Sequence, residues 1–151
     1  MPNNVIVDSQ LLLLLVVGLA GERYILRHRR LKAYRPEDYR VLLNLLTAAE
    51  KIVVTPNTLT ETSNLLGYIG EPDKSFLFQV FRKLIDEAQE FFFESGKVAN
   101  RSEFPRLGLT DSALLEVLSQ SEKTVLLTSD LDLYLAAGEK GYNFHHLRKD
   151  L

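Results

Sequence analysis

Two aspartates directly follow short apolar runs of the chain. Asp8 comes after the β-branched residues 5–7, and Asp130 comes just after the apolar run 125–128. Runs of this length and composition predict buried strands. Asp8 also precedes a second apolar segment, and a carboxylate between two such segments is costly to bury unless something binds it. Both carboxylates are therefore candidates for chemistry at the end of a strand.

Three further acids fall near the starts of predicted helices. Glu61 lies in the second turn of the helix after the second expected strand, Asp111 in the first turn of a helix opened by Thr110, and Asp132 shortly after Asp130. Each has a structural alternative. Asp111 would interact favourably with the helix dipole, Asp132 matches a capping box with Ser129, and Glu61 fits a solvated helix position. Only the acids taken together point to a chemical role.

The expected sheet would bring these carboxylates together. Ligands of parallel α/β sheets bind beyond the carboxyl ends of the strands, and Asp8, Glu61 and Asp130 each follow such an end. Asp111 joins them if its helix starts at the same edge. Converging carboxylates repel one another unless cations lie between them, and hard oxygen ligands favour magnesium, calcium or manganese over zinc. Because such ions orient a water, lower its pKa and stabilise the leaving oxygen of a phosphodiester, the pattern predicts metal-dependent hydrolysis.

The elements that must position these acids alternate along the chain. Apolar runs predict strands at 5–7, 52–54, 125–127 and 142–144. Helical spacing of apolar residues predicts helices at 11–20, 36–49, 56–67, 73–93, 110–119 and 129–137, whereas 95–108 reads as a loop. Alternating strands and helices predict an α/β fold, a three-layer sandwich whose central, mostly parallel sheet is flanked by helices.

Composition sets the broad class of the protein. A length of 151 residues, with 46% hydrophobic and 25% charged residues, fits a single domain over residues 1–151. The net charge of -2 excludes a general polycation, so nucleic-acid binding needs a local basic patch. The absence of cysteine excludes disulfides and thiolate metal sites and suits the cytoplasm. The apolar run 11–20 is shorter than the about 20 residues that span a membrane, so it predicts a buried helix and no membrane segment.

A basic segment at residues 22–35 could supply that patch, since Glu22 is its only acid. Its basic side chains are Arg23, Arg27, Arg29, Arg30, Lys32 and Arg35. Together with Tyr24, His28 and Tyr34, they form a candidate site for phosphate contact and base stacking on RNA. A solvated helix face, or a surface for an acidic partner, remains an open alternative.

Four motifs of the chain resemble the PIN-domain family over nearly its full length. A hydrophobic strand that ends in Asp and a small polar residue appears as VIVDSQLLLL. A Glu in the helix after the second strand appears in TPNTLTETSNLL, and a Gly-Leu-x-Asp helix start appears in GLTDSALLEVL. A Thr-x-Asp-x-Asp-Leu motif after an apolar strand appears in LLTSDLDLYL. The order, spacing and context of the motifs are those of a PIN-like fold.

The resemblance implies a role for each residue of the motifs. Asp8, Asp111 and Asp130 would ligate Mg²⁺ or Mn²⁺. Glu61 would act directly or through a bound water, with Asp132 as an auxiliary acid. Ser9 or Thr128 would hold a ligand carboxylate or a water in place.

The resemblance also implies an activity and its partners. It implies a metal-dependent endoribonuclease that cleaves RNA phosphodiesters by in-line attack of a metal-activated water, without a covalent intermediate. Many relatives of this size are VapC-type toxins that a small antitoxin inhibits, and homodimers are common in the family. Two alternatives stay open: a catalytically weak PIN-fold module that binds RNA or protein, and another metal-dependent phosphohydrolase. The presence of all the main acids argues against the first, and the Asp8-Ser9-Gln10 start lacks the second acid expected of an Asp-x-Asp phosphatase.

Overall fold

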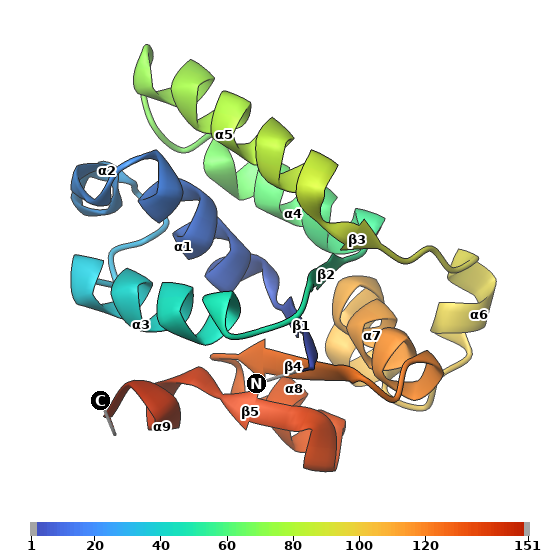
Figure 1. Cartoon of the computed structure of the whole chain (residues 1–151). Helices are drawn as coiled ribbons and strands as arrows, with labels where there is room; N and C mark the ends of the chain where they lie inside the picture. The colour runs from blue at the N-terminus through green and yellow to red at the C-terminus, as the bar shows by residue number, and fades with distance from the viewer. Residues whose placement is uncertain (1–2, 150–151) are drawn as a thin grey trace.

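A computed structural model describes residues 3–149 as an α/β sandwich (Figure 1). The strands are β1 (Asn4–Val7), β2 (Ile52–Val54), β3 (Gln89–Glu90), β4 (Thr124–Thr128) and β5 (Gly141–Asn143). The helices are α1 (Ser9–Ala20), α2 (Glu22–Arg27), α3 (Pro36–Thr47), α4 (Pro56–Leu66), α5 (Asp73–Glu87), α6 (Ser95–Ala99), α7 (Phe104–Gln120), α8 (Leu131–Ala137) and α9 (Phe144–Lys149), with a 3-10 turn η1 (Gly138–Lys140).

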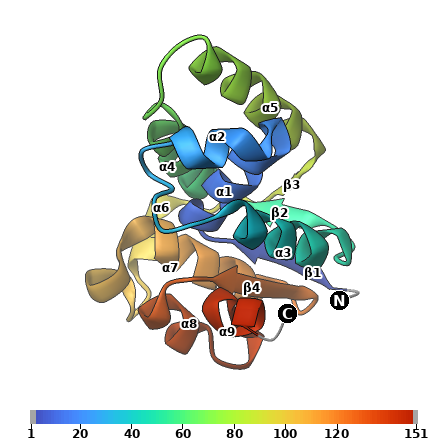
Figure 2. The ribbon, with the colours of Figure 1, turned by 90° about the vertical axis from the view of Figure 1, so that its left-hand side faces the viewer.

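The five strands form one parallel sheet in the order β3-β2-β1-β4-β5. From β1 the chain passes outward through β2 to β3, and it then returns to the other side of β1 to form β4 and β5 (Figures 1 and 2). The predicted α/β class and parallel sheet are therefore confirmed. The order also makes β1 and β4 the neighbours at which the direction of winding reverses.

Helices cover both faces of this sheet because side chains alternate along each strand. Val5 and Val7 face a core that includes α1, α3, α5 and the buried Phe144 of α9. Ile6 and Leu126 face a second core made by α7 and α8. The inner strands β1, β2 and β4 thus bury both of their faces, which explains the nearly continuous apolar runs in the sequence.

Helix α1 is the most enclosed helix of the first core. Residues 11–17 are at most 1% exposed, because α1 lies among the sheet and the helices α3, α4 and α5. The prediction of a buried helix for this apolar run is confirmed. Among residues 3–149, no helix combines the length and the apolar character that crossing a membrane requires.

The helix predicted over 73–93 is shorter in the structure. Helix α5 ends at Glu87, where Ala88 turns to an extended conformation with φ -78° and ψ 155°. Gln89 and Glu90 then pair with β2 as the edge strand β3, so sheet hydrogen bonds replace further helical turns. Phe92, two residues after β3, is 71% exposed.

The loop predicted at 95–108 is wrong, because this segment contains α6 and the first turn of α7. Buried Glu116 of α7 accepts a hydrogen bond of 2.9 Å from Arg101 and lies 3.6 Å from Lys97 Nζ of α6. These ion pairs fix the segment against α7. Gly108 divides α7 into two helical runs with a φ of 86°, a value that favours glycine.

Candidate functional site

The carboxyl ends of β1 and β4 lie side by side at the point where the winding of the sheet reverses. Val7 is paired with Leu127, so Asp8 and Thr128 stand next to each other as the strands end. Ligands of open α/β sheets bind in the crevice at such a point, outside the strand ends. The fold therefore gives Asp8 the position at which a ligand site is expected.

Asp8 is held by hydrogen bonds from both segments that meet there. One oxygen accepts the Leu11 N–H at 3.0 Å, which makes Asp8 the N-cap of α1. The other accepts a hydrogen bond from the Thr128 hydroxyl and another of 3.2 Å from the Ser129 N–H. These donors offset part of the cost of burying a carboxylate that is 6% exposed. They also fix its orientation at the base of the site.

Asp130 lies beside Asp8 at the start of α8. Its Oδ1 accepts the Leu133 N–H at 3.0 Å, and its own N–H donates to Thr128 Oγ1 at 3.0 Å. Asp130 is thus the N-cap of α8, and the capping box predicted for Ser129 and Asp132 is wrong. The reason is the sharp turn after β4, in which Thr128 binds the backbone and the helix starts later than predicted.

Glu61 and Asp111 reach the same edge from two helices. Thr55 caps α4 by accepting the Thr58 N–H at 3.2 Å, which places Glu61 on the exposed second turn. Asp111 is half-buried in the first turn after the kink at Gly108. The helix of Asp111 therefore starts at the shared edge, as the sequence analysis required.

These acids line one hollow with a volume of about 260 Å³. Its lining residues are Asp8, Ser9, Gln10, Glu61, Asp111, Ser129 and Asp130. We call this space the acidic hollow. Asp132 is exposed on α8 and is not among the residues that line it. The structure thus brings together four of the five acids singled out in the sequence.

The carboxylates of the acidic hollow influence one another electrostatically. Burial, followed by the negative charges of Asp130, Asp8 and Glu61, raises the pKa of Asp111 to about 6. Burial also raises the pKa of Asp8, although the hydrogen bonds from Thr128, Leu11 and Ser129 act in the opposite direction. A cation in the hollow would relieve this repulsion.

The donor set of the acidic hollow fits a hard divalent cation, but no ready-made cage is present. Within residues 3–149, no group of three or more His, Asp or Glu side chains is arranged to hold a metal ion. The Ser9 hydroxyl oxygen is buried among its neighbours without a hydrogen-bond partner, and Ser9 lines the hollow. Carboxylate and hydroxyl oxygens are the ligand types of Mg²⁺ and Mn²⁺.

Gln10 and Ser129 were not predicted to line the site, and Tyr34 was predicted to stack on RNA bases instead. Gln10 and Ser129 line the hollow, and the Tyr34 hydroxyl lies 2.9 Å from Ser129 Oγ. Gln10 and Ser129 directly follow the motif residues Ser9 and Thr128, so their position gave a usable signal. Tyr34 is remote in sequence, and only the fold brings it to the site.

The basic segment at 22–35 differs from its predicted role in one respect. Tyr24, His28 and Tyr34 are buried, and His28 Nε2 lies 3.1 Å from the Leu66 carbonyl oxygen, so these rings are closed to base stacking. The basic side chains are exposed. Arg27 forms an ion pair of 3.2 Å with Asp73.

The contact between Tyr34 and Ser129 ties the second half of the basic segment to the acidic hollow. The connector between α2 and α3 runs across the side of the molecule that faces the viewer in Figure 2. Arg29, Lys32 and Arg35 are exposed on this connector. Positive charge therefore lies on the chain next to the residue that contacts the site.

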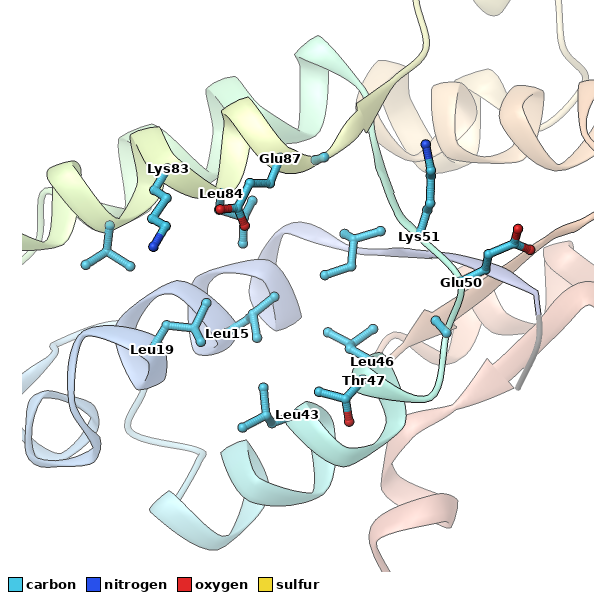
Figure 3. A pocket seen from close by; sticks show the side chains of 14 residues that line it. Leu15, Leu19, Leu43, Leu46, Thr47, Glu50, Lys51, Lys83, Leu84 and Glu87 are labelled. Carbon is cyan, nitrogen blue, oxygen red and sulfur yellow. The ribbon is translucent and has the colours of Figure 1, made fainter.

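A larger hollow of about 740 Å³ lies elsewhere, between α1, α3 and α5 (Figure 3). Its floor and walls are aliphatic, with Leu15, Leu19, Leu43 and Leu46 among them. None of the acids singled out in the sequence lines it. We call it the apolar hollow.

Comparison with known proteins gives a likeness of fold. No protein-family model matches the chain, and no curated protein matches it. The crystal structure of PAE2754 from Pyrobaculum aerophilum is similar, with a TM-score of 0.58 and 17% sequence identity over 99% of this chain and 96% of that one. At this identity the likeness shows the fold alone.

Proposed function

We propose that the chain is a PIN-type endoribonuclease that requires Mg²⁺ or Mn²⁺ and hydrolyses RNA phosphodiesters. The observation that carries the proposal is the acidic hollow, in which Asp8, Glu61, Asp111 and Asp130 from four separate segments share about 260 Å³. Such a concentration of negative charge is unfavourable for the fold by itself. Divalent cations bound between the carboxylates would offset this repulsion and would activate a water for hydrolysis.

Each acid has a separate part in the proposal. Asp8, Asp111 and Asp130 hold the cations, and Glu61 acts directly or through a bound water. Bound Mg²⁺ or Mn²⁺ supplies positive charge that lowers the pKa of a water and offsets the charge developing on the leaving oxygen. Asp132 lies outside the hollow and is given no ligand role.

The neighbours of the acids hold them in place. The Thr128 hydroxyl and the Ser129 N–H fix one oxygen of Asp8, and the Leu133 N–H fixes one oxygen of Asp130. Each carboxylate oxygen has a second lone pair, so these bonds leave acceptor capacity toward the hollow. The unpartnered Ser9 hydroxyl is suited to orient a water or a phosphate oxygen.

The RNA backbone would be held by the basic connector next to the hollow. Arg29, Lys32 and Arg35 are exposed, and Tyr34 anchors the connector to Ser129. Lysine and arginine contacts to phosphates give affinity that falls with salt and does not depend on sequence. Of the predicted RNA contacts, Arg27 is the least suited, since it is paired with Asp73.

The proposal extends to two protein partners. A VapC-type toxin needs an inhibitor, and an arginine of a small antitoxin would be attracted into the acidic hollow by charge. A second copy of this chain would cover the apolar hollow. Its rim carries Glu50, Lys51, Lys83 and Glu87, so that a copy related by a two-fold axis can pair opposite charges across the interface.

Incubation of defined RNA with the purified protein tests the activity. We expect cleavage with Mg²⁺ or Mn²⁺, and loss of cleavage with EDTA and in Asp8→Asn and Asp130→Asn. Asp132→Asn is the matched control, because it removes an equal charge from the same helix start outside the hollow. Cleavage that persists in the Asp8 and Asp130 variants would come from a contaminant and would refute the proposal. Tight RNA binding without cleavage under any metal would favour the binding module instead.

A further inference from the structure

A second polar hollow adjoins the acidic hollow between α4 and α7. It has a volume of about 370 Å³ and is lined by Pro56, Asn57, Thr60, Glu61, Asn64 and Thr110. Glu61 lines both spaces, and Thr110 immediately precedes Asp111. The two hollows are therefore neighbours on the surface, with Glu61 between them. We call the second space the amide hollow.

The amide hollow is built from one face of α4. Asn57, Glu61 and Asn64 are spaced by about one helical turn each, so their side chains lie on the same side of the helix. Thr60 stands beside them, and Thr110 approaches from α7. Residues at this spacing on an amphipathic helix are usually either core or solvated surface, whereas here they line a concave space.

The polar groups of this face are free to bind a ligand. Over the described residues 3–149, the side chains of Asn57, Thr60 and Asn64 make no hydrogen bond, and none of them is buried. No Lys or Arg lines the space. A phosphate group would find no counter-charge there and would be repelled by Glu61. A neutral ligand with several donors and acceptors matches the lining.

We propose that the amide hollow binds one unpaired nucleobase of the RNA, next to the phosphodiester held at the acidic hollow. This inference rests on the proposed nuclease function and adds a base-binding site on α4 to it. The edges of a nucleobase are neutral arrays of donors and acceptors that carboxamides can match in pairs. These edges are free only in unpaired RNA, where the bases can turn away from the strand.

The charges of the two surfaces decide which part of the RNA each one binds. The basic connector holds phosphates on one side of the acidic hollow, and the amide hollow reads a base on another side. Asparagine pairs best with adenine, whose N7 accepts and whose N6 amino group donates. We therefore expect adenine to be favoured at one position beside the cleavage site.

The test compares Asn57→Ala/Asn64→Ala with the wild type on a pool of single-stranded RNA of random sequence. Sequencing of the products gives the base preference around the cut. Asn44→Ala is the matched control, since Asn44 is exposed on α3, away from both hollows. We expect a preference of about tenfold at one position in the wild type and the control, and its loss in the double variant. A preference that is absent, or that survives in the double variant, would overturn the inference.

A binding measurement separates this inference from the nuclease proposal. Fluorescence anisotropy compares the affinity of ten-nucleotide A, C, G and U homopolymers for the wild type and the double variant. Absence of cleavage, with a base preference in binding that the double variant loses, would refute the nuclease and retain the base site. Metal-dependent cleavage with no preference in either assay would retain the nuclease and refute the base site.

Discussion

The apolar hollow and the acidic hollow differ in size, lining and origin. The apolar hollow is about 740 Å³ and is walled by aliphatic side chains of α1, α3 and α5. The acidic hollow is about 260 Å³ and collects four carboxylates, two at the ends of β1 and β4, one on α4 and one just after the kink of α7. The larger space forms where helices diverge over the sheet. The smaller one forms where parallel strands end.

This contrast shows why the volume of a hollow does not by itself identify a functional site. The largest apolar cavity is a common starting point for a ligand site. Here Asp111, whose pKa is raised by burial and then by the negative charges of its neighbours, lies at the smaller space. Repelling carboxylates at the ends of the strands are the better indicator of a functional site, because they cost the fold some stability.

The largest difference in cleavage rate is expected between a variant of the acidic hollow and a variant of the apolar hollow. We expect Asp130→Asn to lower the rate of RNA cleavage by at least about a hundredfold, since a metal ligand contributes several kcal/mol to the reaction. Leu43→Ala, in the apolar hollow, should leave the rate within about twofold. Initial rates on one defined RNA at saturating Mg²⁺ provide the measurement. Equal losses in the two variants would remove the distinction between the hollows.

A smaller loss is expected when a support of the acidic hollow is removed. Thr128→Val deletes the hydroxyl that donates to Asp8 and accepts from the Asp130 N–H. Buried polar groups left without partners cost about 1–3 kcal/mol of unfolding free energy, and we expect cleavage to fall by about tenfold. Thr128→Ser should restore both. Denaturant titration and cleavage rates are compared, and a variant with normal stability and normal rate would show that Asp8 needs no such support.

The pH dependence of stability tests the repulsion within the acidic hollow. The pKa of Asp111 is raised from 3.8 to about 6, so the folded state binds the proton more tightly than the unfolded state. The resulting loss of stability is absent below pH 3.8, grows as the pH rises toward about 6, and is complete above it.

We therefore expect the free energy of unfolding, measured without divalent ions, to include a loss on the order of 1–2 kcal/mol between pH 4 and pH 7 that Asp111→Asn removes. Thermal unfolding at several pH values measures the difference between the two proteins. At pH 7, Mg²⁺ should raise the melting temperature of the wild type more than that of the variant. Identical pH profiles would contradict the raised pKa.

The smallest effect on activity is expected at the apolar hollow. If a second copy covers it, Leu43→Glu should weaken the dimer by placing a charge in an apolar contact, while cleavage per chain stays within about twofold. Light scattering over a range of protein concentrations gives the mass in solution. A wild-type protein that remains monomeric at high concentration would exclude this role for the hollow.

Particular residues show how far the sequence could predict this molecule. The buried α1, the Thr55 cap with Pro56 at the start of α4, and the strand that ends at Asp8 follow from local patterns, and the structure has them. The short strand β3 and the helix α6 were missed, because Gln89 and Glu90 become a strand only by pairing with β2, and α6 is held by ion pairs to α7. Their stabilising partners lie elsewhere in the chain.

Some features of the site were likewise predictable from local sequence, and others depend on the fold. Local sequence patterns were enough to predict which carboxylates follow strands or open helices, because apolar periodicity and helix-start residues are local properties. Three features follow from the folded arrangement of distant segments: Asp111 shares a hollow with Asp8, Tyr34 reaches Ser129, and Asn57 and Asn64 line a space next to the acids. These facts depend on the strand order and on the kink at Gly108, which are set by packing between segments distant in sequence.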